Sequence, residues 1–258
     1  MDLNNFPIAI TFDIDWAPDF AIKKCASICR DRNIPATFFS THRSEFIDEL
    51  LFDNFFEVGI HPNFLQNSSH GLNEIEVMET MSNIVPHAVS MRTHGLYQTS
   101  NLFLMIMKKF RNIKFDFSLY IPNNKFIIPY QFFFKDNFIY RIPYQWEDDL
   151  YFYNKSIGEI LFKKAYYQIF NFHPMHVLLN SEDEENYTLL KESLSCPLME
   201  LKIKKINYIN TGIGTRNYLE KILDSVEPHR FCKARDILAS ISSNKVKDSL
   251  SLNSTGII

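Results

Sequence analysis

Residues 10–20 read ITFDIDWAPDF, and the apolar run at 8–12 ends in two carboxylates that are separated by a single residue. Such a run is typical of a buried strand. Side chains on a strand alternate between its two faces, so Asp13 and Asp15 would share a face if the strand continued through them. Two neighbouring carboxylates repel each other unless a cation or a proton lies between them. This stretch therefore predicts a strand whose end needs a compensating positive charge.

Strand-like and helix-like runs alternate along the rest of the chain. Strands are expected at 7–13, 35–40, 56–60, 88–92, 115–119, 138–143 and 168–173. Helices are expected at 18–32, 74–85, 101–110, 183–195 and 214–225, with Asn73 and Ser100 as N-caps of two of them. This alternation indicates parallel strands joined by crossover helices, and about seven strands favour a barrel over an open sheet.

No repeat, linker or change of composition divides the 258 residues. We therefore predict a single α/β domain over 1–258, with a polar tail at about 240–258 that is loosely ordered. The Phe-rich run at 126–134 is interpreted as barrel packing rather than as a lipid-binding stripe.

Charge and cysteine usage exclude several functional classes. A net charge of −3 without an evident basic stripe argues against a nucleic-acid partner. The four cysteines contain no CxxC pair, so buried reduced thiols are expected rather than disulfides or a cysteine-rich zinc site. The N-terminus lacks a signal-peptide pattern, and no apolar run is long enough to span a membrane. The simplest prediction is a cytoplasmic protein.

Several histidines fall where the predicted strands end. His61 follows FEVGI, His94 follows AVSMRT, and His173 follows QIFNF. The carboxyl ends of parallel strands meet at one rim, where Asp13 and Asp15 also lie. One such histidine would more often be structural, but their joint placement points to a site. One aspartate and two imidazoles suit Zn²⁺, and also Fe²⁺, Co²⁺ or Mn²⁺, while the second aspartate stays nearby as a base.

At these residues the chain resembles the polysaccharide deacetylases of the NodB-homology type, carbohydrate esterase family 4. The matching stretches over about 7–180 are TFDIDW, PATFF, FEVGIHPNF, MRTHG, WEDD and FNFHPMH, in that order. The chain looks like a member of a divergent subgroup that carries the motifs FDxD, HPNF and RxHG. The resemblance implies a distorted (β/α) barrel that uses a divalent metal, most often zinc, to remove N-acetyl groups from carbohydrates.

The resemblance also implies roles for single residues. Asp13 looks like the catalytic base, Asp15 and His61 like metal ligands, and His173 like the general acid. Arg92 looks like the residue that fixes the base through a charge-assisted pair.

The WEDD stretch contributes two further residues to the site that the resemblance implies. Asp148 and Trp146 look like supports for that arginine and a wall of the pocket. A core position fits Trp146 equally well.

Two positions depart from the family pattern. The family motif is H-x-x-x-H, but the position four residues after His61 is Leu65. His94 and His70 could each replace the missing ligand. We favour His94, because a strand end holds geometry better than a polar loop does. His70 then contacts either the substrate or one of the metal ligands, although it is retained as a metal candidate.

The last motif has a doubled histidine. Pro174 interrupts the strand after His173, so His176 is interpreted as structural or substrate-binding.

The predicted reaction is hydrolysis of an N-acetyl amide on a carbohydrate, with the backbone N–H of Gly95 or Leu96 facing the oxyanion. A cytoplasmic location favours a precursor sugar, nucleotide-linked or lipid-linked, in the synthesis of a surface polysaccharide such as O-antigen or capsule. Two alternatives are hydrolysis of another C–N bond, such as a cyclic amide, and a catalytically silent sugar-binding protein.

Overall fold

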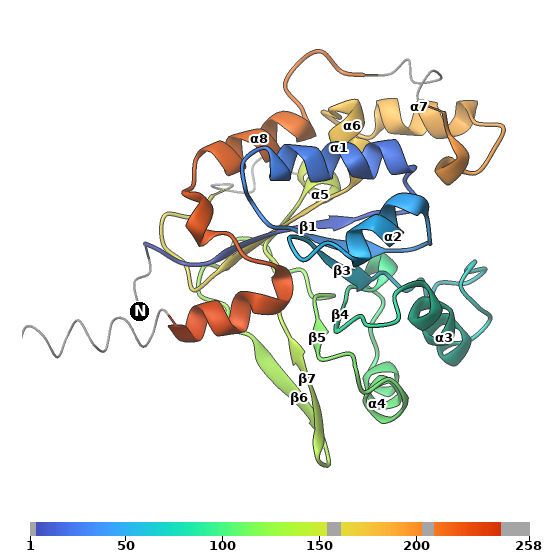
Figure 1. Ribbon diagram of the computed structural model, residues 1–258, viewed down its shortest axis with the longest axis vertical. Helices are drawn as coiled ribbons and strands as arrows, with labels where there is room; N and C mark the ends of the chain where they lie inside the picture. The colour runs from blue at the N-terminus through green and yellow to red at the C-terminus, as the bar shows by residue number, and fades with distance from the viewer. Residues whose placement is uncertain (1–3, 154–160, 203–208, 244–258) are drawn as a thin grey trace, which may run out of the picture.

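The computed structural model describes residues 4–153, 161–202 and 209–243 (Figure 1). Its centre is a nine-stranded sheet with the order β6-β7-β5-β4-β3-β2-β1-β9-β8. Every neighbouring pair is parallel except β6 and β7. The strands are β1 (Ile8–Asp13), β2 (Thr37–Ser40), β3 (Glu57–Ile60), β4 (Ser90–Met91), β5 (Phe115–Asp116), β6 (Tyr130–Phe134), β7 (Asn137–Arg141), β8 (Trp146–Glu147) and β9 (Gln168–Phe172). The predicted α/β fold is confirmed.

The sheet curls because one short stretch of chain joins a strand near one margin of the sheet to the strand at the other margin. Only residues 142–145 separate β7 from β8, yet β7 pairs with β5 and β8 pairs with β9. The two strands therefore count as one segment of a distorted, incompletely closed barrel. All seven predicted strands are present, although those at 88–92 and 115–119 are reduced to two residues each.

Eight α-helices have both of their ends within the described parts of the chain. They are α1 (Asp19–Arg30), α2 (Glu45–Leu51), α3 (Glu74–Ile84), α4 (Ser100–Lys109), α5 (Asp148–Tyr153), α6 (Pro174–Leu179), α7 (Glu185–Ser193) and α8 (Thr215–Asp224). Figure 1 shows α1, α6 and α8 together on one side of β1. The five predicted helices are all found, whereas the short α2, α5 and α6 were not anticipated.

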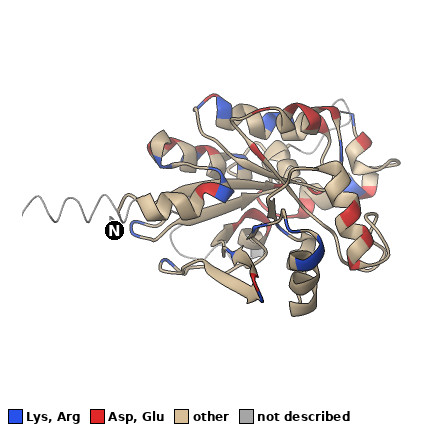
Figure 2. Ribbon diagram, turned by 60° about the horizontal axis from the view of Figure 1, so that its bottom comes forward, with Lys and Arg blue, Asp and Glu red and all other residues tan. Residues whose placement is uncertain are grey.

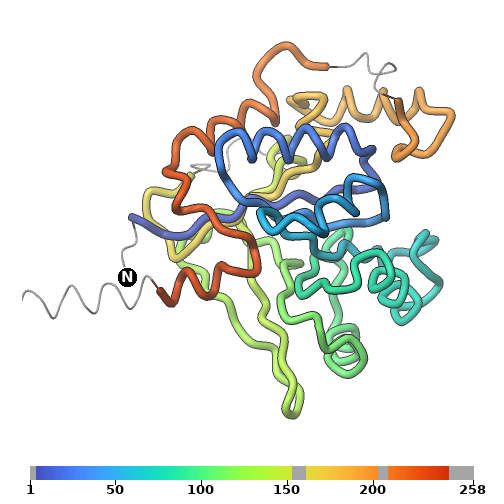
Figure 3. Tube along the Cα trace, viewed as in Figure 1, coloured from blue at the N-terminus to red at the C-terminus, as the bar shows by residue number. Residues whose placement is uncertain are grey.

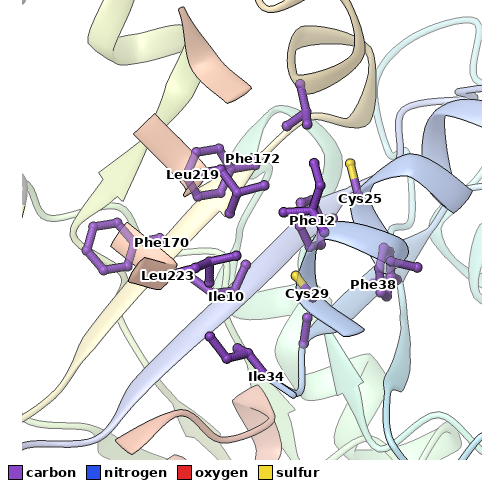
Figure 4. Packing of buried hydrophobic residues seen from close by; sticks show 14 of the residues in the cluster. Ile10, Phe12, Cys25, Cys29, Ile34, Phe38, Phe170, Phe172, Leu219 and Leu223 are labelled. Atoms are coloured by element: carbon purple, nitrogen blue, oxygen red, sulfur yellow. The ribbon is translucent and has the colours of Figure 1, made fainter. Parts of the chain in front are cut away.

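The largest apolar cluster fills the space between the sheet and the helices α1, α6 and α8 (Figure 4). All six residues of β1 are buried, as expected for a parallel strand covered on both faces. The rings of Phe12 and Phe38 stack with centroids 4.8 Å apart. Cys25 and Cys29 of α1 lie in the same cluster as buried free thiols, as predicted, whereas Cys196 and Cys232 are only half-buried. Burial raises the pKa of Cys29 to about 12, so the thiol stays protonated and packs as a small apolar group.

Two predicted helix starts can be checked against the capping contacts. Asn73 caps α3 as predicted, because its Oδ1 accepts hydrogen bonds from the N–H groups of Ile75 and Glu76. The prediction that Ser100 caps α4 is wrong. Thr99 has the extended backbone of a cap, and its hydroxyl accepts from the N–H of Leu102, so Ser100 is already helical.

The interpretation of run 126–134 as barrel packing is wrong for four of its nine side chains. Phe126, Ile128, Tyr130 and Phe133 are exposed, whereas Phe132 and Phe134 pack on the cluster around α4. The reason is topological: β6 pairs only with β7, so it forms the margin of the sheet. Figure 3 shows this hairpin projecting from the body of the molecule.

The end of the described chain is more ordered than the predicted tail suggests. Residues 237–243 are helical, and Ile237 and Ile241 are buried in a third apolar cluster. Residues 244–258, the rest of that predicted tail, lie outside the described residues. Among the residues described, no helix combines the length and apolar character that crossing a membrane requires.

Candidate active site

The candidate site lies at the carboxyl ends of four strands. Asp13 is the last residue of β1, and His61 directly follows β3. Arg92 and His94 follow β4, and His173 follows β9. The strand order places β1 between β2 and β9, so these ends converge as the sequence predicts.

A tight turn, not a continuing strand, brings the second aspartate into the site. β1 ends at Asp13, and Asp15 and Trp16 both have left-handed backbones, with φ of 40° and 56°. The expectation that the two aspartates share a strand face is therefore wrong. Such backbones cost on the order of 1 kcal/mol each. The turn is held by the N–H of Trp16, which donates to Thr41 Oγ1 at 2.9 Å.

Three side chains meet at the distances of a metal centre. Asp15 Oδ1 lies 3.1 Å from His61 Nε2 and 3.1 Å from His94 Nδ1. The two ring nitrogens are 3.3 Å apart. Zinc ligands at about 2.0 Å in a tetrahedron are separated by about 3.3 Å, so this triangle matches one face of such a site. The fourth position would remain open to water and substrate.

The surroundings orient these donors. His61 Nδ1 donates to the carbonyl of Arg92 at 2.7 Å, which leaves the lone pair of Nε2 facing the triangle. The rings of His94 and Trp16 pack edge to face with centroids 5.3 Å apart. Burial favours a raised pKa for Asp15, but the neighbouring imidazoles of His61 and His94 outweigh it and hold that pKa well below its usual range. The donor set therefore fits a divalent cation.

His70 lies outside this triangle. Its Nδ1 accepts a hydrogen bond from the N–H of Asn63 at 3.0 Å, and its ring packs on Trp16. Burial lowers its pKa to about 4, so the ring is neutral at physiological pH. Of the two predicted replacements for the missing ligand, only His94 is brought to Asp15 and His61.

The predicted base is held from two sides. Asp13 Oδ1 accepts from Arg92 Nη1 at 3.0 Å, and Asp13 Oδ2 accepts from Asn171 Nδ2 at 2.9 Å. Arg92 is fully buried, and its guanidinium lies over the ring of Tyr144 at 4.3 Å. Its Nε donates to the carbonyl of Phe117. The guanidinium is therefore fixed, and it fixes Asp13 in turn.

Asp148 supports His173 and not Arg92, contrary to the role implied by the resemblance. Its carboxylate accepts from His173 Nδ1 at 2.7 Å and from the His173 N–H at 2.9 Å. Burial alone would lower the pKa of His173, but Asp148 and Asp149 outweigh it and raise that pKa well above the usual range. His173 Nε2 lies 3.7 Å from Asp15 Oδ2, so this imidazole faces the triangle of Asp15, His61 and His94.

Three residues of the site were missed by the sequence reasoning. Thr11 and Asn171 point to the same interior as Asp13 and His173, and Glu147 accepts from Asn171 Nδ2 at 2.9 Å. Strand alternation could have indicated the first two, since each lies two positions before a predicted site residue. Glu147 precedes Asp148 in WEDD and carried no separate signal.

Two cavities meet at Asp15 and His173. The first, of about 260 Å³, also contains Asp13, His94 and Gly95. The second, of about 210 Å³, is lined by residues that include His176, Tyr187 and Lys191. Both cavities therefore border Asp15 of the triangle.

The three predicted substrate contacts differ in position. Gly95 lines the first cavity with φ of 61°. The N–H of Leu96 is engaged by the Thr93 carbonyl, so only Gly95 remains a candidate oxyanion donor. His176 lines the second cavity. Trp146 is 3% exposed and packs on Phe172 within the core, which matches the core alternative.

Comparisons with known families and solved structures found proteins that are similar to this chain. A model of the WbmS-like polysaccharide deacetylase family matches residues 10–191. No curated protein matches the chain. The structure of WbmS from Bordetella bronchiseptica, a proposed polysaccharide deacetylase involved in O-antigen biosynthesis, is 27% identical, with a TM-score of 0.73 over 84% of this chain and 90% of its own.

A second solved structure is more distant. The peptidoglycan deacetylase PdaC from Bacillus subtilis is 10% identical, with a TM-score of 0.50 over 96% of this chain and 97% of its own. At that identity the likeness concerns the fold alone.

Proposed function

The chain belongs to the WbmS-like family of polysaccharide deacetylases, and we propose that it removes an N-acetyl group from a carbohydrate with a divalent metal held by Asp15, His61 and His94. The observation that carries the proposal is the triangle of donor atoms with sides of 3.1, 3.1 and 3.3 Å. Zn²⁺ suits one carboxylate and two imidazoles, and Fe²⁺, Co²⁺ or Mn²⁺ would also be accepted. When bound, such an ion activates water and polarises the amide carbonyl.

The protein supplies the proton transfers from either side of this triangle. Asp13 accepts the proton of the attacking water, while Arg92 and Asn171 keep its carboxylate in place. His173 gives a proton from Nε2 to the departing nitrogen, and Asp148 holds the imidazole by its other nitrogen. The N–H of Gly95 borders the same cavity and is the oxyanion donor in this proposal.

The proposed substrate is a precursor sugar of a surface polysaccharide. The support comes from WbmS, whose described involvement is in O-antigen biosynthesis and which is 27% identical to this chain. We propose the same class of substrate here, with the sugar lying across the two cavities that meet at Asp15 and His173.

The two alternatives make different demands on the site. A catalytically silent sugar-binding protein has no need for three metal donors beside an acid and a base, so their joint presence favours an enzyme. Hydrolysis of another C–N bond would use the same groups, and only the choice of substrate separates it from deacetylation.

The test combines metal analysis with a substrate screen. The purified protein should contain about one divalent ion per chain, and it should release acetate from at least one acetamido sugar. A screen of cyclic amides runs in parallel. Metal without acetate release but with opening of a cyclic amide would favour the other hydrolase. A protein that binds no metal and shows no turnover would support the catalytically silent alternative.

A further inference from the structure

The β6–β7 hairpin presents apolar side chains to solvent that the proposed reaction does not use. Phe126 is 52% exposed, Ile128 63% and Phe133 62%. They lie on β6 or on the residues that lead into it, and β6 is the outermost strand of the described sheet. Side chains on both faces of this strand therefore reach the margin of the molecule. We call the exposed residues Phe126, Ile128, Tyr130 and Phe133 the hairpin ridge.

Basic residues outnumber acidic ones among the exposed charged residues of the segment that contains the hairpin ridge. Between residues 101 and 141 the only exposed acidic residue is Asp136, whereas the exposed basic residues are Lys108, Lys109, Arg111, Lys114 and Lys135. This excess is local, because the whole chain has a net charge of −3. In Figure 2, blue segments mark the turn of the hairpin and the neighbouring helix α4.

Contacts join the basic residues to the hairpin. The ammonium groups of Lys108 and Lys135 lie 4.9 and 5.7 Å from the ring centroid of Phe134. The carbonyl of Lys114 accepts from the N–H of Tyr140 on β7. Lys108 of α4 and Lys135 at the turn of the hairpin therefore border β6, the strand that carries part of the hairpin ridge. We call the ridge together with these two lysines the hairpin surface.

We infer that this surface docks on an anionic lipid bilayer. Aromatic and aliphatic side chains enter the interfacial region of a bilayer, and nearby lysines and arginines are attracted to anionic headgroups. The charge complementarity favours this occupant over a second copy of the chain, whose hairpin would bring the same positive charges into contact. The inference goes beyond the proposed function, because docking needs neither the metal nor the sugar.

The test is co-sedimentation of the full chain with vesicles. We expect binding to phosphatidylcholine vesicles that contain about one third phosphatidylglycerol, and little binding to phosphatidylcholine alone. The double variant Ile128→Ser/Phe133→Ser should lower the partition coefficient at least about tenfold. Reversing two charges in Lys108→Glu/Lys109→Glu should do the same, and this variant tests the surface even if the first one unfolds.

Matched control variants carry similar changes elsewhere. Phe52, which is 90% exposed after α2, is replaced in Phe52→Ser. Lys23 and Lys24 are exposed neighbours on α1 and are replaced in Lys23→Glu/Lys24→Glu. Both controls should bind anionic vesicles like the parent chain. Absence of vesicle binding, equal binding to both vesicle types, or loss of a self-associated species in the Ile128→Ser/Phe133→Ser variant would overturn the inference.

Discussion

Asn171 Nδ2 lies 2.9 Å from Asp13 Oδ2 and 2.9 Å from Glu147 Oε1, so a single amide nitrogen holds two buried carboxyl groups. Asn171 comes from β9, next to β1, and its Oδ1 accepts from both Arg92 and Thr11. All four possible hydrogen bonds of the amide group are thus engaged inside the protein. The proposed base is therefore positioned by a neighbouring strand as well as by Arg92.

Replacing Asn171 with leucine should lower kcat about a hundredfold and leave KM nearly unchanged. The change removes a donor from each carboxyl group, and unsatisfied buried polar groups cost about 1–3 kcal/mol each. Steady-state kinetics on the substrate found in the screen would measure this. The matched variant Asn171→Gln keeps the amide and should recover part of the rate. A rise in KM at constant kcat would instead indicate that Asn171 contacts the sugar.

Replacing each aspartate of the opening motif by asparagine should affect metal content and turnover differently. Asp13→Asn should keep the metal and lose activity at least about a thousandfold, because it removes the proposed base. Asp15→Asn should lose the metal, because it removes the donor that lies 3.1 Å from both histidines. Elemental analysis and acetate release measure the two effects on each variant. An active Asp13→Asn protein would show that the base is another group.

The fold could be predicted from the sequence where burial sets a simple period. β1, β2 and β9 are fully buried and read as apolar runs, and α1 shows its apolar face at helical spacing. Short elements gave no such signal: α2 has seven residues and β8 only two. The exposed side of β6 was also missed, because a Phe-rich run looks the same in a core and on a margin.

The candidate site was predictable where it follows from strand ends, and not where it depends on a turn. Alternation along β1 could not reveal that Asp15 reaches His61 through two left-handed residues. The pairing of Asp148 with His173 depends on β8 lying beside β9, and no pattern in the sequence indicates that strand pairing. His94 lies beside Asp15 and His61, but it starts a 3-10 turn three residues after β4, so the rigidity of a strand end is not what places it there.

The metal triangle predicts different outcomes for two histidines that lie close together. His94→Gln should weaken binding of Zn²⁺ or Co²⁺ more than about a hundredfold, because it removes one of three protein donors. His70→Gln should change the affinity by less than about tenfold, since His70 bonds to Asn63 and packs on Trp16 instead. Titration of the metal-free protein with Co²⁺, followed by its visible absorption, compares the two variants directly. Equal losses would place His70 among the ligands.

Glu147 should make the stability of the metal-free protein depend on pH. Burial and the charges of Asp149 and Asp13, only partly opposed by His173, raise its pKa to about 7 from an ordinary value of 4.5. A carboxyl group with a raised pKa in the folded state favours folding most at low pH. That contribution is lost as pH rises from about 4.5 to about 7, and it amounts to a few kcal/mol at most.

The variant Glu147→Gln removes this titration and keeps an acceptor for Asn171. Its unfolding temperature relative to the parent chain should therefore rise by several degrees between pH 4.5 and pH 7.5. The comparison uses chelated protein, because a bound cation nearby would favour the ionised carboxylate. The control Glu79→Gln, at an exposed position of α3, should show no such trend. A constant difference between Glu147→Gln and the parent chain across this range would mean that Glu147 is already ionised at pH 4.5.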